Sequence, residues 1–172
     1  MKSVSEFSGN GISEPSANDL GNMLAIFKSG QGYHHHLFPE IFCTPDSEPE
    51  IKNYLASFLK PRNPFRKRRR FALAWFEENE LKGYLLYQLH ISSDIFFGQN
   101  QWMCHIEDIA VDENSRKKGI ASSLLSHLIE TLDGLGKGLV SAQVWRGNTG
   151  SEILFEKYKF DDASKQFYYV LK

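Results

Sequence analysis

The chain has 172 residues, of which 41% are hydrophobic and 13% aromatic, and its formal net charge is −1. This length suits one domain with a single core, and the hydrophobic content excludes a chain that is disordered throughout. The near-neutral charge argues against nucleic acid or a membrane surface as a general electrostatic partner.

Cys43 and Cys104 are the only cysteines, and they form no Cys-x-x-Cys pair. No N-terminal apolar run resembles a signal peptide or a spanning helix. We therefore expect a reducing, cytoplasmic setting, with both cysteines acting as small core residues.

The N-terminal part of the chain is predicted to hold an arm and then a helix. Residues 1–16 are rich in Ser, Gly and Asn, which indicates a loosely ordered arm with a short strand around residues 3–7. The rest, residues 17–172, is expected to form one domain. Its first helix follows Asn18 and Asp19 and should end near residues 29–32. The apolar residues that predict it are Leu20, Met23, Leu24 and Phe27.

The following elements are predicted from apolar periodicity and from turn residues. Ile51, Leu55 and Phe58 indicate a second helix that ends before Pro61. The remaining predicted elements are a hairpin of strands 71–76 and 81–89, a strand 102–111, a helix from residue 120 to 133, a strand 139–145, a helix 148–160 and a terminal strand 167–171. Hairpins pair antiparallel and helix crossovers favour parallel pairs, so we expect an α/β (α+β) fold with a mixed, mostly antiparallel sheet flanked by helices.

The segment 106–122 is the most informative part of the sequence. It runs from an apolar strand through a polar turn, Arg116-x-x-Gly119-x-Ala121, into a helix. Successive backbone N–H groups at the start of a helix can hold a phosphate or pyrophosphate. The spacing matches neither the Gly-x-x-x-x-Gly-Lys-Ser/Thr loop nor the Gly-x-Gly-x-x-Gly fingerprint, so a nucleoside-triphosphatase loop and a dinucleotide fold are excluded.

This loop, after a strand that ends in Val111, resembles the acetyl-CoA loop of the GNAT superfamily of N-acetyltransferases. Further along, Asn148-x-x-Ser151-x-x-x-Phe155 resembles the family's later Asn-x-x-Ala-x-x-x-Tyr motif. The order of predicted elements also matches the GNAT fold.

The resemblance implies acetyl-CoA as co-substrate, no metal, and transfer of the acetyl group to a primary amine by direct attack in a ternary complex. The acceptor is a small-molecule amine or a protein amine, and a homodimer is open because family members are often dimers. The implied cofactor-binding residues are Ile109, Ala110 and Val111 in the strand, Arg116, Lys117, Lys118, Gly119, Ile120, Ala121 and Ser122 in the loop, and Asn148, Ser151 and Phe155 in the later helix.

Two residues are candidate catalytic groups. Glu107 is the favoured base, and strand alternation is expected to put it and Asp108 on opposite faces. The alternative is that Glu107 pairs with a surface base or attracts a cationic substrate. Phe155 stands where the family has a tyrosine that can protonate the leaving sulfur, so Tyr158, one helical turn away, is the candidate acid. The alternatives are that Tyr158 only packs and that water, Tyr33, Tyr84 or Tyr168 gives the proton.

Two further features leave alternatives open. Residues 34–36 are three histidines, and we expect no metal site because adjacent histidines do not converge. Tyr33, His35 and His36 are instead expected in the acceptor pocket, or else in a polar loop.

The basic run 66–70 is either a solvated loop or a contact for an acidic partner, RNA or an anionic acceptor. The rival function is a weakly active or inactive CoA-binding or RNA/protein-binding module.

Overall fold

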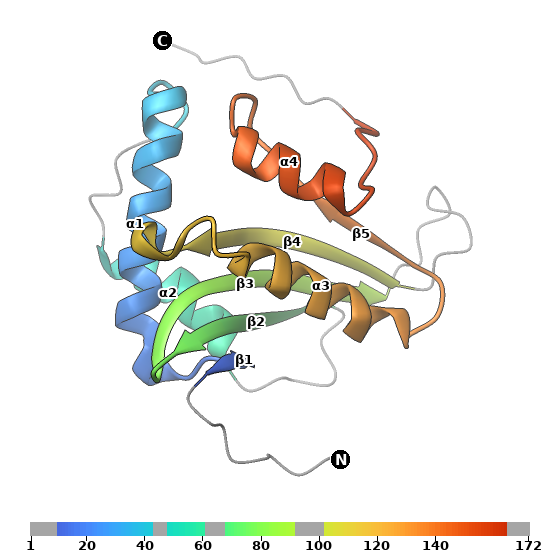
Figure 1. Ribbon diagram of the computed structural model, residues 1–172, viewed down its shortest axis with the longest axis horizontal. Helices are drawn as coiled ribbons and strands as arrows, with labels where there is room; N and C mark the ends of the chain where they lie inside the picture. The colour runs from blue at the N-terminus through green and yellow to red at the C-terminus, as the bar shows by residue number, and fades with distance from the viewer. Residues whose placement is uncertain (1–9, 43–47, 61–67, 92–101, 165–172) are drawn as a thin grey trace.

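A computed structural model describes residues 10–42, 48–60, 68–91 and 102–164. Its centre is a five-stranded sheet in the order β1-β2-β3-β4-β5, drawn in Figure 1. The strands are β1 (Gly11–Ser13), β2 (Arg68–Glu77), β3 (Glu80–Ile91), β4 (Trp102–Val111) and β5 (Gly138–Ala142), and the helices are α1 (Leu20–Leu37), α2 (Glu48–Leu59), α3 (Ile120–Asp133) and α4 (Thr149–Lys157). Neighbouring strands pair antiparallel except β4 and β5, which are parallel. The predicted fold class is confirmed.

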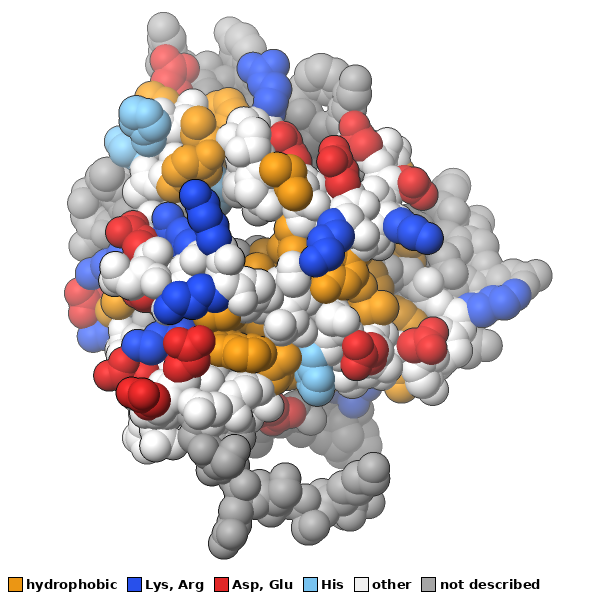
Figure 2. Space-filling view, in the orientation of Figure 1, with side chains coloured by type: hydrophobic (Ala, Val, Ile, Leu, Met, Phe, Trp, Pro, Cys, Tyr) orange, Lys and Arg blue, Asp and Glu red, His pale blue; other side chains and the backbone are white. Residues whose placement is uncertain are grey.

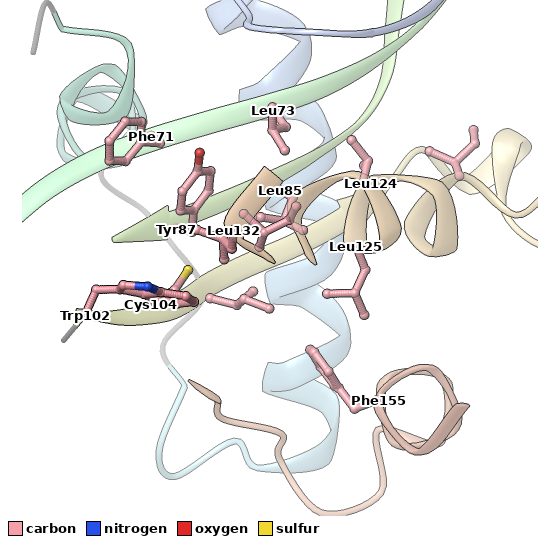
Figure 3. Close-up of a cluster of buried hydrophobic side chains, with 13 residues drawn as sticks. Phe71, Leu73, Leu85, Tyr87, Trp102, Cys104, Leu124, Leu125, Leu132 and Phe155 are labelled. Atoms are coloured by element: carbon pink, nitrogen blue, oxygen red, sulfur yellow. The ribbon is translucent and has the colours of Figure 1, made fainter. Parts of the chain in front are cut away.

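The sheet has a separate hydrophobic core on each face, because successive strand residues point to opposite sides. On one face, α3 and α4 cover Leu85 and Tyr87 of β3 (Figure 3). On the other face, α1 and α2 cover Tyr84 and Leu86. Cys104 is buried in the first core, as expected of a small structural residue, whereas Cys43 lies outside the described residues.

The predicted hairpin, second helix, strand 102–111 and helix from residue 120 are confirmed. Glu78 and Asn79 join β2 to β3 with positive φ angles of 53° and 65°. Two successive positive φ angles define a type I′ turn, which matches the twist of the strands without the favoured Asn-Gly pair. The Glu78 N–H donates to Asn10 Oδ1 at 2.7 Å, so a side chain outside the hairpin supports the turn.

The predicted end of the first helix near residues 29–32 is wrong, because α1 continues to Leu37. A glycine within a helix costs about 1 kcal/mol relative to alanine, so Gly30 and Gly32 weaken the helix without forcing it to stop. The last turns of α1 are held by tertiary contacts. The Tyr33 hydroxyl donates to the Gly147 carbonyl at 3.0 Å.

One strand prediction also needs correction, and one strand was not expected. The strand predicted over 139–145 ends at Ala142, and the chain then turns at residues 145–148, where the Asn148 N–H donates to the Trp145 carbonyl at 3.0 Å. Within the predicted arm, Gly11–Ser13 forms β1 and pairs with β2. The strands expected near residues 3–7 and 167–171 lie outside the described residues. None of the helices described here is long and apolar enough to span a membrane.

Gly83 fixes the distance between β3 and the start of α3. A Cβ atom added at Gly83 would lie 2.9 Å from Ile120 Cγ2 and 3.1 Å from the Ala110 carbonyl oxygen. We expect Gly83→Ala to lower the free energy of unfolding by about 1–3 kcal/mol, since overpacking forces neighbours apart. Urea denaturation measures this change.

The matched control is Gly30→Ala, because Gly30 lies in α1 with open space where the Cβ would be. This variant should leave stability unchanged or raise it by up to about 1 kcal/mol. Equal effects of the two substitutions would mean that β3 and α3 are not in close contact at Gly83.

Candidate functional site

A cleft opens where β4 and β5 separate. Their pairing runs from Trp102 opposite Gly138 to Ile106 opposite Ala142, and β5 ends there while β4 continues to Val111. The cleft has a volume of about 370 Å³, within the range of small-molecule sites. Its lining comes from α1 and the segment after it, α2, β4, the end of β5 and the segment after it, and α4: Phe27, Gln31, His34, Phe42, Tyr54, Ile106, Glu107, Asp108, Ile109, Ala142, Gln143, Trp145, Asn148, Ser151 and Phe155.

A β-bulge in β4 brings two carboxylates to the same face of the sheet. Leu86 pairs with Asp108 and Tyr87 with Ile106, so Glu107 is an extra residue without a partner in the register. A bulge shifts the alternation of side chains by one residue. Glu107 and Asp108 therefore both lie on the face that α1 and α2 cover. The expectation of opposite faces is wrong, because it assumed an unbroken strand.

Hydrogen bonds from β3 hold both carboxylates. Gln88 Nε2 donates to Glu107 Oε1 at 2.6 Å, and the Tyr84 hydroxyl donates to Asp108 Oδ2 at 2.7 Å. Burial raises the pKa of Asp108 to about 6, although the hydrogen bonds from Tyr84 and from the Ile109 N–H act in the opposite direction. With its pKa at about 6, Asp108 is still mostly ionised at neutral pH.

Tyr54 of α2 faces this pair of charges. Burial raises the pKa of Tyr54, and the negative charges of Glu107 and Asp108 raise it further. The phenol therefore stays neutral at physiological pH. Phe27 lies against Tyr54 with ring centroids 6.0 Å apart, so these two rings form one aromatic wall of the cleft.

The loop between β4 and α3 has the geometry of an anion site. Lys117 and Gly119 have positive φ angles of 62° and 86°, and α3 begins directly afterwards at Ile120. A backbone whose φ angles alternate between positive and negative in this way turns successive N–H groups toward a common point. The dipole of α3 adds positive potential there. A Cβ at Gly119 would meet no atom within 4 Å, so the loop is open to solvent at this position. Figure 2 shows Lys and Arg side chains beside a hollow near the start of α3.

Arg116 is tied to other parts of the chain. Its Nε donates to the Val111 carbonyl at 3.3 Å, and its Nη2 donates to Ser29 Oγ of α1 at 3.3 Å. Ser29 in turn donates to the Glu113 carboxylate. These contacts orient the loop relative to α1 and to the end of β4, so the loop's backbone groups are fixed in place before a ligand binds.

The three predicted residues of the later helix motif line the cleft together. Asn148 Oδ1 accepts from the Ser151 N–H at 3.3 Å and so caps α4. Phe155 points from α4 toward the sheet, where it is buried and lies 5.0 Å from the Phe160 ring (Figure 3). The ring of Phe155 thus reaches the cleft but brings no proton donor.

Tyr158 has a different position from the one expected of a catalytic acid. Its hydroxyl donates to the Ser122 carbonyl at 2.7 Å, which joins α4 to the first turn of α3. It does not belong to the described lining of the cleft. The hydroxyls of Tyr33 and Tyr84 also have partners, at Gly147 and Asp108, and Tyr168 lies outside the described residues. Among the described tyrosines, Tyr54 is the one that lines the cleft.

Of the three adjacent histidines, His34 faces the cleft. It stacks on Phe42 at 5.1 Å, and burial lowers its pKa. Its Nδ1 is buried without a hydrogen-bond partner among the described residues. His35 Nδ1 is bonded to the Phe42 carbonyl instead, and Tyr33 and His36 lie outside the cleft lining. No group of three His, Cys, Asp or Glu side chains in the described part of the chain could hold a metal ion.

Several lining residues were not among the predicted site residues: His34 was not singled out from the histidine run 34–36, and Phe42, Tyr54 and Trp145 were not indicated at all. Phe27, Gln31 and His34 lie at i, i+4 and i+7 on α1, which is the spacing of one helix face. That pattern would have identified His34 if the helix had been extended past Gly32. Phe42 and Trp145 lie in irregular segments, where no periodicity relates a residue to a face.

One comparison with known proteins identifies a family. A family model described as acetyltransferase (GNAT) family matches residues 33–160, which is more than half of the chain. No curated protein matches the sequence at a significant level.

Three solved structures illustrate the structural likeness. A mutant of the BH1408 protein from Bacillus halodurans has a TM-score of 0.77 and 16% identity, over 94% of this chain and 99% of that one. An aminoglycoside acetyltransferase from an uncultured soil metagenomic sample, in complex with sisomicin, has a TM-score of 0.63 and 19% identity, over 94% of this chain and 95% of that one. A ribosomal-protein-alanine N-acetyltransferase from Brucella melitensis biovar Abortus 2308 has a TM-score of 0.58 and 16% identity, over 94% of this chain and 96% of that one. At these identities the structures report the fold alone.

Asp108 makes stability depend on pH. Its pKa is about 6 in the folded protein against 3.8 for an unperturbed aspartate, so the folded state binds this proton more tightly than the unfolded state. The resulting stabilisation is complete below about pH 4 and is lost as the pH rises to about 6, with a total of about 3 kcal/mol. Asp108→Asn removes this titration. Between pH 4 and pH 7 the parent should lose about 3 kcal/mol of its free energy of unfolding through this group, and the variant should not. The free energy of the variant minus that of the parent should therefore rise by this amount over the same range.

Urea denaturation at several pH values measures this difference. The control is Asp133→Asn, at an exposed carboxyl in the last turn of α3. Its difference from the parent should not vary over the same pH range. A flat profile for Asp108→Asn as well would mean that Asp108 is solvated in the folded protein.

Proposed function

This chain belongs to the acetyltransferase (GNAT) family, and from that membership we propose that it transfers the acetyl group of acetyl-CoA to a primary amine. The single observation that carries the proposal is the position of the anion-binding loop beside a cleft that holds two carboxylates. The cleft lies where β4 and β5 separate, and the loop follows the part of β4 that continues past that point to Val111. One end of the site suits a phosphorylated donor, and the other suits an amine.

The residues of the loop fit the pyrophosphate of the donor. We assign it to the backbone N–H groups of residues 117–122, with Lys117 and Lys118 adding positive charge and Gly119 leaving open space for close approach. The pantetheine arm would lie in the gap between β4 and β5, beside Ile109, Ala110 and Val111. N–H groups along this edge can also polarise the acetyl carbonyl, and such donors supply several kcal/mol to an oxyanion.

The acceptor must lose a proton before it attacks. An alkylammonium has a pKa near that of lysine, about 10.4, so a base is needed at neutral pH. We propose that Glu107 receives this proton through a water molecule, with Gln88 holding the carboxylate in place. The neutral amine nitrogen then bonds to the thioester carbon and loses a second proton to solvent. The carbon–sulfur bond breaks, and the sulfur leaves as a thiolate that takes up one proton.

The proton for the thiolate is proposed to come from solvent. A thiol pKa near 8.5 makes the thiolate only about 2 kcal/mol less stable than the thiol at neutral pH. Phe155 cannot donate, and Tyr158 would first have to release the Ser122 carbonyl. We therefore propose that Tyr158 is a positioning residue, which holds α4 against the first turn of α3.

Phe155 favours a second candidate function, a CoA-binding module with weak or no turnover. Both candidates bind acetyl-CoA, and they differ in whether an amine then takes the acetyl group. Release of free CoA from acetyl-CoA, measured across a panel of amines, separates them: amine-dependent release supports the transferase, and its absence supports the binding module.

Acetyl-CoA should stabilise the folded protein, since a ligand at 100 times its dissociation constant adds about 2.7 kcal/mol. Gly119→Glu should abolish the rise in melting temperature, because it adds bulk and negative charge beside the pyrophosphate. The control is Gly136→Glu, because Gly136 has a similar φ of 81°, against 86° at Gly119, and is equally open. The control should keep the rise although both variants carry the same backbone strain. A retained rise in a folded Gly119→Glu protein would place the donor elsewhere.

Glu107→Gln should lower turnover about 10²-fold or more, with the largest loss at low pH, because the amide cannot accept the proton. The dissociation constant of acetyl-CoA should stay nearly unchanged. Steady-state rates against pH and a thermal shift with acetyl-CoA measure the two effects. Glu130→Gln, at an exposed carboxylate on α3, is the control and should match the parent. A Glu107→Gln enzyme with the parental pH profile would rule Glu107 out as the base.

A further inference from the structure

The cleft holds more negative charge than its surroundings balance. Glu107 and Asp108 both lie in its lining, and their described partners, Gln88, Tyr84 and the Ile109 N–H, are neutral donors. None of the described lining residues is a lysine or an arginine, and burial lowers the pKa of His34, which keeps that ring neutral at physiological pH. Neutral donors satisfy the oxygen atoms but leave up to two negative charges for a guest to compensate.

Arg70 is the described cation that acts on this region, and it lies outside the cleft. Its charge lowers the pKa of Tyr54, against the larger effect of burial. Its guanidinium, however, donates to Ser57 Oγ at 2.7 Å and lies 5.2 Å from the Phe58 ring. Neither Ser57 nor Phe58 lines the cleft. Arg70 is therefore held at the last turn of α2, and the carboxylate pair remains available to a bound cation.

The walls of the cleft suit an alkyl chain that ends in ammonium groups. Phe27 and Tyr54 form one aromatic pair, and Phe42 and Trp145 form another with ring centroids 4.6 Å apart. Aromatic faces attract ammonium groups and also pack against methylene groups. The volume of about 370 Å³ lies near the lower end for ligand sites, and the acetyl end of the donor must share it. A slender acceptor fits these limits better than a molecule of several rings.

We propose that the acceptor is a linear aliphatic diamine; this inference rests on the proposed function and specifies its substrate. One amine loses its proton toward Glu107 and attacks the thioester. The other stays protonated, is paired with Asp108 and lies against Tyr54. A monoamine is neutral when it attacks, so it leaves the second carboxylate without a cation. The diamine keeps one positive charge throughout the reaction, and the product is the mono-acetylated diamine and free CoA.

The test compares acceptors that differ only in the second charge. The values of kcat/KM for 1,4-diaminobutane and 1,5-diaminopentane are measured against those for 1-aminobutane, 1-aminopentane and 4-amino-1-butanol. The diamines should be favoured at least tenfold, and added salt should reduce this ratio because it screens the second ammonium. In Asp108→Asn the ratio should fall toward one, whatever the absolute rates. The control Asp133→Asn should keep the parental ratio.

The outcomes separate this inference from the proposed function. Acetyl transfer to monoamines, to sisomicin or to a peptide amino group at rates equal to the diamines would overturn the diamine assignment and leave the transferase intact. The diamine assignment would also be overturned if Asp108→Asn left the ratio of kcat/KM for diamines to that for monoamines at the parental value. No release of CoA with any amine would refute the transferase and the diamine assignment together. The comparison of 1,4-diaminobutane with 4-amino-1-butanol uses the parent enzyme alone, so it decides the question even if the Asp108 variant folds poorly.

Discussion

Strands β4 and β5 stay hydrogen-bonded only as far as Ile106 and Ala142, and the next residue of β4, Glu107, forms a bulge. These two irregularities coincide, and each has its own effect. The separation leaves the rest of β4 without a described strand neighbour on the β5 side, which opens the cleft. The bulge changes the direction of the side chains, so two carboxylates enter that cleft. A regular sheet would have sealed the cleft and turned one carboxylate to the opposite face.

The remaining elements hold the two sides of this opening in place. Arg116 and Ser29 tie the anion-binding loop to α1, and Tyr158 ties α4 to the first turn of α3. Tyr33 ties the last turns of α1 to Gly147, in the turn that leads into α4. Individually such hydrogen bonds contribute about 1 kcal/mol, but they join segments that are far apart in the sequence. The positions of the loop between β4 and α3 and of the turn before α4 are therefore coupled through α1.

Asp108 lowers the stability of the folded protein at neutral pH and places a negative charge in the cleft. A carboxylate in this position destabilises the folded state at neutral pH, because burial raises its pKa to about 6. Asp108 lines the cleft, so a cation bound there would offset this cost. The aromatic rings around the pair serve the same end, since they lower the local polarity and still attract an ammonium group.

Local patterns in the sequence determined most of the elements and the position of the loop between β4 and α3. The apolar spacing located α2, the hairpin, β4 and α3, and the Arg116-x-x-Gly119-x-Ala121 turn located that loop, because each of these depends on residues close together in the chain. Periodicity failed where contacts between distant segments decide the outcome. The last turns of α1 are held by Tyr33, which contacts the turn before α4. The glycines from which the helix end was predicted carry no information about that contact. Likewise the bulge at Glu107 is a property of the register between β4 and β3, and the sequence of β4 alone does not give that register. Only the tertiary structure could therefore put Glu107 and Asp108 on one face and select His34 from three adjacent histidines, because both depend on which surfaces meet when the sheet and α1 come together.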